Sequence, residues 1–137
     1  MKNSRFAVAV HILALTSHNP REQLTSDFIA NSVNTNPVVI RRISGKLKKA
    51  GLLTSHAGIP GVAVTKESSD ISLLDIYKAV QEDNEATFTM HENPNPDCAV
   101  GRNIQAVLDN KFDRAQKAME NELAAQTLQD VLHDLFD

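Results

Sequence analysis

The 137-residue chain is long enough for one compact domain or a small domain with an extension, and 42% of its residues are hydrophobic, enough for a core. Its single cysteine excludes an intrachain disulfide and suits a reducing cytoplasm. The net charge of −3 is unevenly distributed: residues 1–66 carry nine Lys or Arg and two acids, whereas residues 67–137 carry five and fifteen. The basic half can therefore offer phosphates a local positive field, and the acidic half cannot serve as a DNA surface.

The first apolar run, residues 6–15, resembles the core of a signal peptide. His11 interrupts this run, however, and no convincing small-x-small cleavage site follows it. Phe6, Val10 and Leu13 recur at helical spacing, so we interpret the run as the first helix of the N-terminal domain. No segment is long enough to span a membrane.

The next pattern is that of a helix-turn-helix. Thr25 or Ser26 can cap a short helix that ends at about Val33. Within it, Ala30 is small enough for two helices to cross closely, and Asn34 tolerates the positive φ of a tight turn. The positions expected to hold the two helices together are apolar, namely Ile29, Val33, Ile40 and Ile43.

The second helix of this pair is predicted by a cap at Asn36, a proline at the first helical position and a stop at Gly51. Its predicted buried stripe is Val39, Ile43, Leu47 and Ala50. Five cations and no acid lie off that stripe, which indicates a recognition helix whose N-terminal half enters a major groove. The predicted DNA contacts on it are Asn36, Val38, Arg41, Arg42 and Lys46.

The segment after this helix is typical of a wing. Residues 53–57 and 62–65 are β-prone, and Gly58-Ile59-Pro60-Gly61 between them has the composition of a turn. The candidate contacts with phosphates or a minor groove are His56, Gly58 and Gly61. The alternative is an ordinary hairpin that closes a small core.

Residues 71–76 predict the start of another helix, which runs to about Val80. Ser72 and Asp75 can form a capping box, and Ile71 and Ile76 a hydrophobic staple. Residues 82–99 then lose periodicity and contain two prolines, so they are predicted to form a loop.

A long helix is predicted from about Ala99 to Ala125, too long for so small a domain to cover. Its apolar stripe therefore favours a two-fold homodimer, although the helix could instead pack on its own domain. The predicted interface residues are Ile104, Leu108, Phe112, Ala115, Met119 and Leu123. A last short helix begins at Thr127, and its predicted apolar side is Leu128, Val131, Leu132 and Leu135.

Cys98 immediately precedes the long helix, where the helix dipole and unpaired N–H groups favour a thiolate. Arg102, one turn later, could favour it further, and His91 is the one nearby candidate for a base, so these three residues form a candidate sensor. The alternative is that Cys98 is a small buried hydrophobe. The spacing of His91 and Cys98 fits no zinc signature, so no metal site is predicted. No catalytic set is recognisable, which argues against an enzyme; a small thiol enzyme that uses Cys98 stays as an alternative.

Five stretches together resemble the Rrf2 family of bacterial regulators, the group of IscR, NsrR and CymR: residues 3–7, 36–42, 47–53, 71–76 and 127–132. Residues 91–102 are similar to the YwnA-type branch of that family. The resemblance implies winged-helix heads joined by long crossing helices, operator binding and, usually, repression. Cluster-binding members place three cysteines between the fourth helix and the dimer helix, where this chain has only Cys98. A [2Fe–2S] centre needs four protein ligands, so no iron–sulfur cofactor is expected.

The sequence thus predicts a mainly α fold with a small β-hairpin wing. The predicted divisions are a winged helix-turn-helix domain over 1–81, with its wing at about 53–65, a sensor loop over 82–99, and a dimerisation helix and short helix over 100–137. The predicted function is that of a cytoplasmic, homodimeric transcriptional regulator on double-stranded DNA, which responds through Cys98. The alternatives are a protein-interaction module and a regulator that responds to a small ligand without redox sensing.

Overall fold

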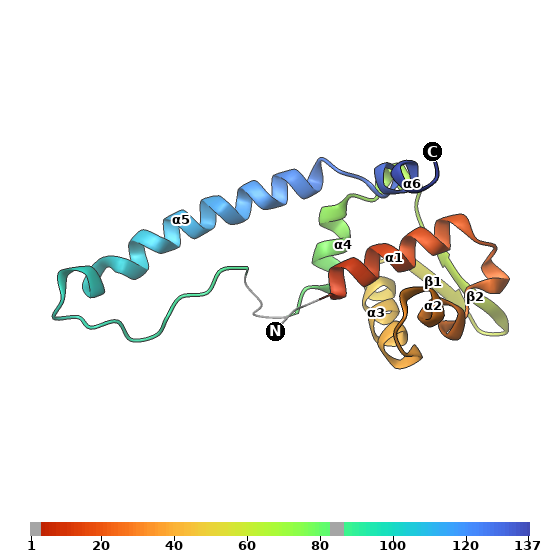
Figure 1. Ribbon diagram of the computed structural model, residues 1–137, viewed down its shortest axis with the longest axis horizontal. Coiled ribbons are helices and arrows are strands. Elements are labelled where there is room, and N and C mark those ends of the chain that lie inside the picture. The colour runs from red at the N-terminus through yellow and green to blue at the C-terminus, as the bar shows by residue number, and fades with distance from the viewer. Residues whose placement is uncertain (1–3, 83–86) are drawn as a thin grey trace. The chain divides into compact units, whose positions relative to one another are not determined.

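The computed structural model describes residues 4–82 and 87–137. Residues 83–86 of the predicted loop lie outside the described residues, as does residue 3 of the stretch 3–7 that resembles the Rrf2 family. The chain forms two compact units, Met1–Gln81 with Leu123–Asp137, and Glu82–Glu122. The prediction of a mainly α fold with a small antiparallel hairpin is confirmed (Figure 1). In chain order the elements are α1 (Arg5–His18), η1 (Arg21–Gln23), α2 (Ser26–Val33), α3 (Pro37–Lys49), β1 (Leu53–His56), β2 (Ile59–Val64), η2 (Ser68–Asp70), α4 (Leu73–Val80), α5 (Ala99–Ala124) and α6 (Leu128–Phe136).

The core of the first unit is aliphatic and forms around α1. Ile12 and Leu13 of α1 are completely buried, as is Leu47 of α3. The start of α1 is tied to the end of α4, because Nε of Arg5 donates a hydrogen bond to the carbonyl oxygen of Val80 at 3.2 Å. Helix α1 therefore forms the centre of the winged helix, on which the helices of the DNA-binding motif pack.

The helix-turn-helix has the predicted caps and turn. The hydroxyl oxygen of Thr25 accepts from the backbone N–H of Phe28 at 3.1 Å and caps α2. Asn34 ends α2 with a left-handed backbone, at φ 66°. Ala30 is buried, as the close crossing of α2 and α3 requires. Gly51 (φ 81°) follows α3. The prediction that Ala50 belongs to the buried stripe is wrong, because Ala50 is the C-cap, where the chain leaves the helix.

Two capping boxes fix the last helix to the first unit. Ser72 and Asp75 cap α4, and Thr127 and Asp130 cap α6 in the same way. The two caps lie side by side, since N–H of Leu73 donates to Gln126 and N–H of Leu128 donates to Ile71, both at 2.8 Å. Leu128 and Ile71 are fully buried there. Leu135 was predicted to lie on the apolar side of α6, yet it is 59% exposed, whereas Leu128 and Leu132 of the same helix pack in or against the core.

The wing is a two-stranded antiparallel hairpin in which Leu53 pairs with Val64 and His56 pairs with Ile59. The turn is therefore Ala57–Gly58, and the prediction that Gly58 to Gly61 form the turn is wrong. Gly58, at φ 81°, supplies the tight turn. The extra residues are absorbed by a bulge between the Thr54 and His56 pairs, where residues 60–62 of β2 lie opposite one residue of β1.

The second unit consists of α5 and the segment before it. Residues 87–98 run alongside α5. The rings of Phe88 and Phe112 stack with centroids 5.4 Å apart, and Nε2 of Gln105 donates to the carbonyl oxygen of His91 at 3.4 Å. Gly101 has no room for a side chain, because a Cβ there would overlap the carbonyl oxygen of Asn95. The first turn of α5 is thus held against the segment that carries Cys98.

Candidate nucleic-acid interface

The N-terminal end of α3 presents one capping residue and one exposed apolar residue. Asn36 Oδ1 accepts from the backbone N–H of Val39 at 3.0 Å, so this oxygen is occupied by the cap and the side-chain amide is left to donate. Val38 is 63% exposed. An exposed valine at the start of a helix suits contact with the methyl group of thymine in a major groove.

The basic side chains of α3 lie opposite its buried face. Ile40, Ile43 and Leu47 are buried in the core, whereas Arg41 and Arg42 are exposed. Lys46, another predicted contact, is half-buried, and Lys48 and Lys49 are exposed at the far end of the helix. Since α3 contains no acidic residue, this face can concentrate a positive field toward a phosphate backbone.

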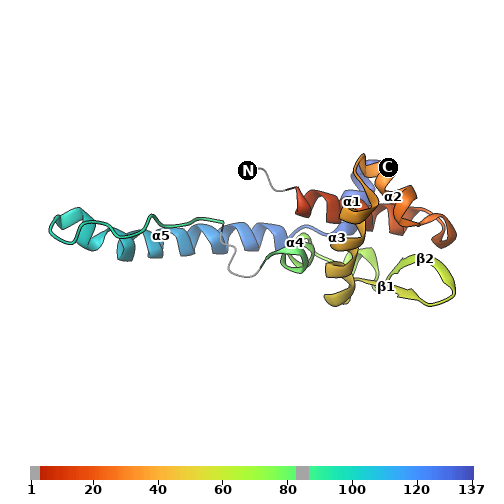
Figure 2. The same ribbon diagram turned by 90° about the horizontal axis from the view of Figure 1, so that it is seen from below.

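The wing lies in the same unit as α3 (Figure 2). His56 is exposed at the end of β1, and Gly58 sits at the turn with no neighbour within 4 Å of the position a Cβ would take. Gly61 has a different environment, because a Cβ there would overlap the backbone of Arg21. Of the two predicted glycine contacts, Gly58 thus faces open space, and Gly61 is half-buried against η1.

The candidate sensor residues lie in the second unit. Cys98 is exposed, and the pKa of its thiol is lowered by hydrogen bonds from the backbone N–H of Gly101 first and of Val100 second. These are free N–H groups of the first turn of α5. His91 and Arg102 are both exposed, and over the described residues neither makes a hydrogen bond or ion pair with the sulfur. The helix end therefore accounts for the lowered pKa without either partner.

The predicted dimer stripe runs along a helix that is poorly covered. None of the 26 residues of α5 is buried. Val107 is 51% exposed, so apolar surface also lies at the edge of the stripe. The stripe itself is half-buried apart from Ala115, which is exposed, and its other members are Ile104, Leu108, Phe112, Met119 and Leu123. Phe112 owes part of its burial to Phe88 of the same chain.

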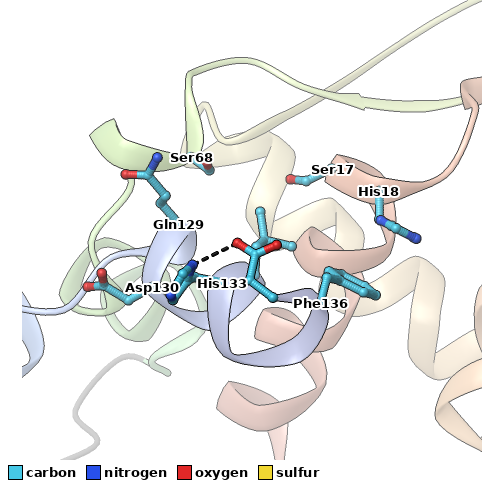
Figure 3. Close-up of a pocket in the computed structure, with 9 residues that line it drawn as sticks. Ser17, His18, Ser68, Gln129, Asp130, His133 and Phe136 are labelled. Atoms are coloured by element: carbon cyan, nitrogen blue, oxygen red, sulfur yellow. Dashed lines mark hydrogen bonds and ion pairs between the residues drawn. The ribbon is translucent and has the colours of Figure 1, made fainter.

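A polar pocket of about 360 Å³ lies between the end of α1, η2 and α6 (Figure 3). His133 Nδ1 and Asp137 Oδ2 are 2.7 Å apart in its wall, and the ring of His18 stacks on Phe136 at 3.8 Å. Ser17 already donates to the carbonyl oxygen of Leu13. Because these groups bond within the unit, we interpret the pocket as the seam where α6 docks on α1.

No helix in the described part of the chain is both long and apolar enough to cross a membrane.

Comparison with known proteins links this geometry to a family. A family model described as Rrf2, iron-dependent transcriptional regulator, matches residues 2–134. The chain is 56% identical over 136 residues to YwnA of Bacillus subtilis strain 168, which is named as an HTH-type transcriptional regulator. That match covers 99% of this chain and 100% of YwnA.

Solved structures agree with the sequence match. A crystal structure of a protein described as DNA-binding has a TM-score of 0.78 and 51% identity, and the match covers 94% of this chain and 99% of that chain. IscR of T. potens has a TM-score of 0.69, with 98% of this chain and 88% of that chain covered; at 19% identity this likeness shows the fold alone. The relatives are regulators, not enzymes.

The family description names iron, and proteins can hold iron as a cluster bound by cysteine thiolates. A [2Fe–2S] centre takes four protein ligands. The whole chain has one cysteine, Cys98. Within residues 4–82 and 87–137, no three His, Cys, Asp or Glu side chains gather where they could hold a metal ion. The donor set therefore does not fit an iron–sulfur cluster.

Proposed function

Because the chain belongs to the Rrf2 family of transcriptional regulators, we propose that it is a cytoplasmic homodimer that binds an operator through α3 and the wing and represses transcription. The observation that carries the proposal is the acid-free basic face of α3, exposed beside the wing of the same unit. In this proposal Arg41 and Arg42 read base edges, Asn36, Val38 and Lys46 support them, and the wing residues His56, Gly58 and Gly61 approach the backbone or minor groove.

The dimer is supported by α5. A helix of 26 residues is about 39 Å long, and a half-buried apolar stripe without one buried residue is suited to a second copy of the same helix. A two-fold dimer would place two α3 helices on half-sites about one helical turn apart. We accordingly assign DNA binding to residues 1–81, sensing to residues 82–99 and dimerisation to the segment from residue 100 on.

Selection from a random pool of duplexes tests the function. The wild-type protein should enrich a sequence with two related half-sites, and its affinity for that duplex should fall steeply as salt is raised. A reporter placed behind the enriched sequence should be transcribed less when the protein is present. A pool that stays random after several rounds would contradict operator binding, and a protein that binds only other proteins would give this result.

A thiol response is the second element of the proposal, and it is favoured by the exposure of Cys98 and its lowered pKa. A thiolate is the reactive form, so the pH midpoint for alkylation by iodoacetamide should lie below that of the same chain unfolded in guanidinium, where the backbone N–H groups no longer hold the sulfur. Cys98→Ser should bind the enriched duplex and lose any response to peroxide. An unchanged peroxide response in this variant would exclude Cys98 as the sensor and would favour a small ligand.

A further inference from the structure

The wing is attached to the segment between α1 and α2 at one point of very close approach. Gly61 lies in the bulge of β2 at φ 82°, and a Cβ there would overlap the carbonyl oxygen of Arg21. The side chain of Arg21 follows the same surface, with Cγ 3.3 Å from that Cβ position. Gly58 has nearly the same φ, 81°, and open space around it. Only a glycine at position 61 therefore lets the backbone of Arg21 approach this closely, and as a result Arg21 lies against β2 of the wing.

The guanidinium of Arg21 has unmet hydrogen-bonding capacity. The residue as a whole is half-buried, yet its Nε and Nη2 are both buried and have no hydrogen-bond partner over the described residues. Buried charged donors without acceptors are costly, and arginine stays protonated at any physiological pH. The free protein thus holds a cation beside the wing that would gain from an anionic acceptor.

The wing has no other strong cation. Residues 53–64 contain neither lysine nor arginine, and His56 is the one titratable side chain among them. A hairpin of this kind can approach a duplex closely and still contribute no charge-assisted contact to a phosphate. Arg21, although distant in sequence, lies where it can supply that charge.

We propose that Arg21 is a phosphate-binding residue of the DNA interface, held on the wing by the contact between its backbone and Gly61. On the duplex its side chain turns outward, so that the unpaired N–H groups donate to a phosphate oxygen, and its contribution is independent of base sequence. This inference rests on the proposed function, because it presumes that the wing meets DNA. The binding partner is a nucleic-acid backbone and no other anion.

The test compares Arg21→Met with Arg114→Met in the full-length protein. Methionine keeps an apolar stem against Gly61 and removes the charge. Arg114 is exposed on α5 and is not one of the apolar stripe residues, so its variant carries the same change in net charge in the other compact unit. The probes are the wild-type-enriched duplex and a random duplex, each of about 30 base pairs, enough for two half-sites. Affinity is measured over a series of salt concentrations, together with the unfolding temperature.

For Arg21→Met we expect the same fold loss of affinity on both duplexes, and a slope of log affinity against log salt that is shallower by about 0.9 for each arginine removed. The unfolding temperature should not fall. Arg114→Met should match the wild type. An unchanged slope with wild-type affinity would overturn the inference while the proposed function stands, as would a lower unfolding temperature with unchanged DNA binding. If the wild type binds neither duplex, both proposals fail.

Discussion

Replacing Arg41 and Arg42 together by alanine should abolish specific operator binding and leave the chain folded. Both side chains are exposed on α3, opposite the buried Ile40, Ile43 and Leu47, so their removal creates no cavity. A bidentate arginine–guanine contact discriminates by about 1–3 kcal/mol, so the pair accounts for about 2–6 kcal/mol, or roughly 30-fold to 10⁴-fold in affinity. Footprinting on the enriched duplex and the unfolding temperature together check this expectation.

The matched control for this double variant is the replacement of Lys48 and Lys49 by alanine. Both lysines are exposed on the same helix, two turns further from its N-terminus, and their removal changes the net charge equally. They should contribute to phosphate attraction alone, so this variant should bind operator and random duplexes less tightly by similar factors. An arginine double variant that still protects the wild-type site would show that α3 does not read the bases.

Local signals in the sequence predicted most of the fold. Thr25, Asn36 and Ser72 were each recognisable as helix caps, because a cap depends on residues only three positions apart. The αL residue at Asn34 followed from the same local chemistry. The same local reasoning failed for the turn of the wing. Gly58, Pro60 and Gly61 all suit a turn, but only Gly58 lies in the turn that forms, and Pro60 and Gly61 belong to β2.

Contacts between distant segments were not predictable in this way. Nothing in the sequence pairs Arg21 with Gly61, because their approach depends on η1 folding against a bulge in β2. The neighbouring caps of α4 and α6 likewise join residues more than fifty positions apart. Candidate DNA-reading residues could be named from the sequence because they share one helix. Arg21 could not be named in this way, because only the folded chain brings it to the wing.

Introducing a charge into the middle of the α5 stripe should break the proposed dimer. In Leu108→Asp a carboxylate replaces a half-buried apolar side chain, and in a two-fold interface the change occurs twice. Loss of the second half-site contact should lower operator affinity by about 10²-fold to 10⁴-fold, the usual gain from linking two binding sites. Light scattering after size exclusion would report a monomer, and circular dichroism would show whether the helix survives.

The control for this variant is Ala106→Asp, because an aspartate at this exposed position lies on the face of α5 away from the stripe. It carries the same charge and a similar cost in helix propensity, yet it should leave the mass in solution and the operator affinity unchanged. If Leu108→Asp instead stays dimeric with wild-type affinity, the stripe packs against residues of its own chain. The stacking of Phe112 on Phe88 is one such contact. Two α3 helices would then have to be paired through another surface, and operator recognition would not depend on α5.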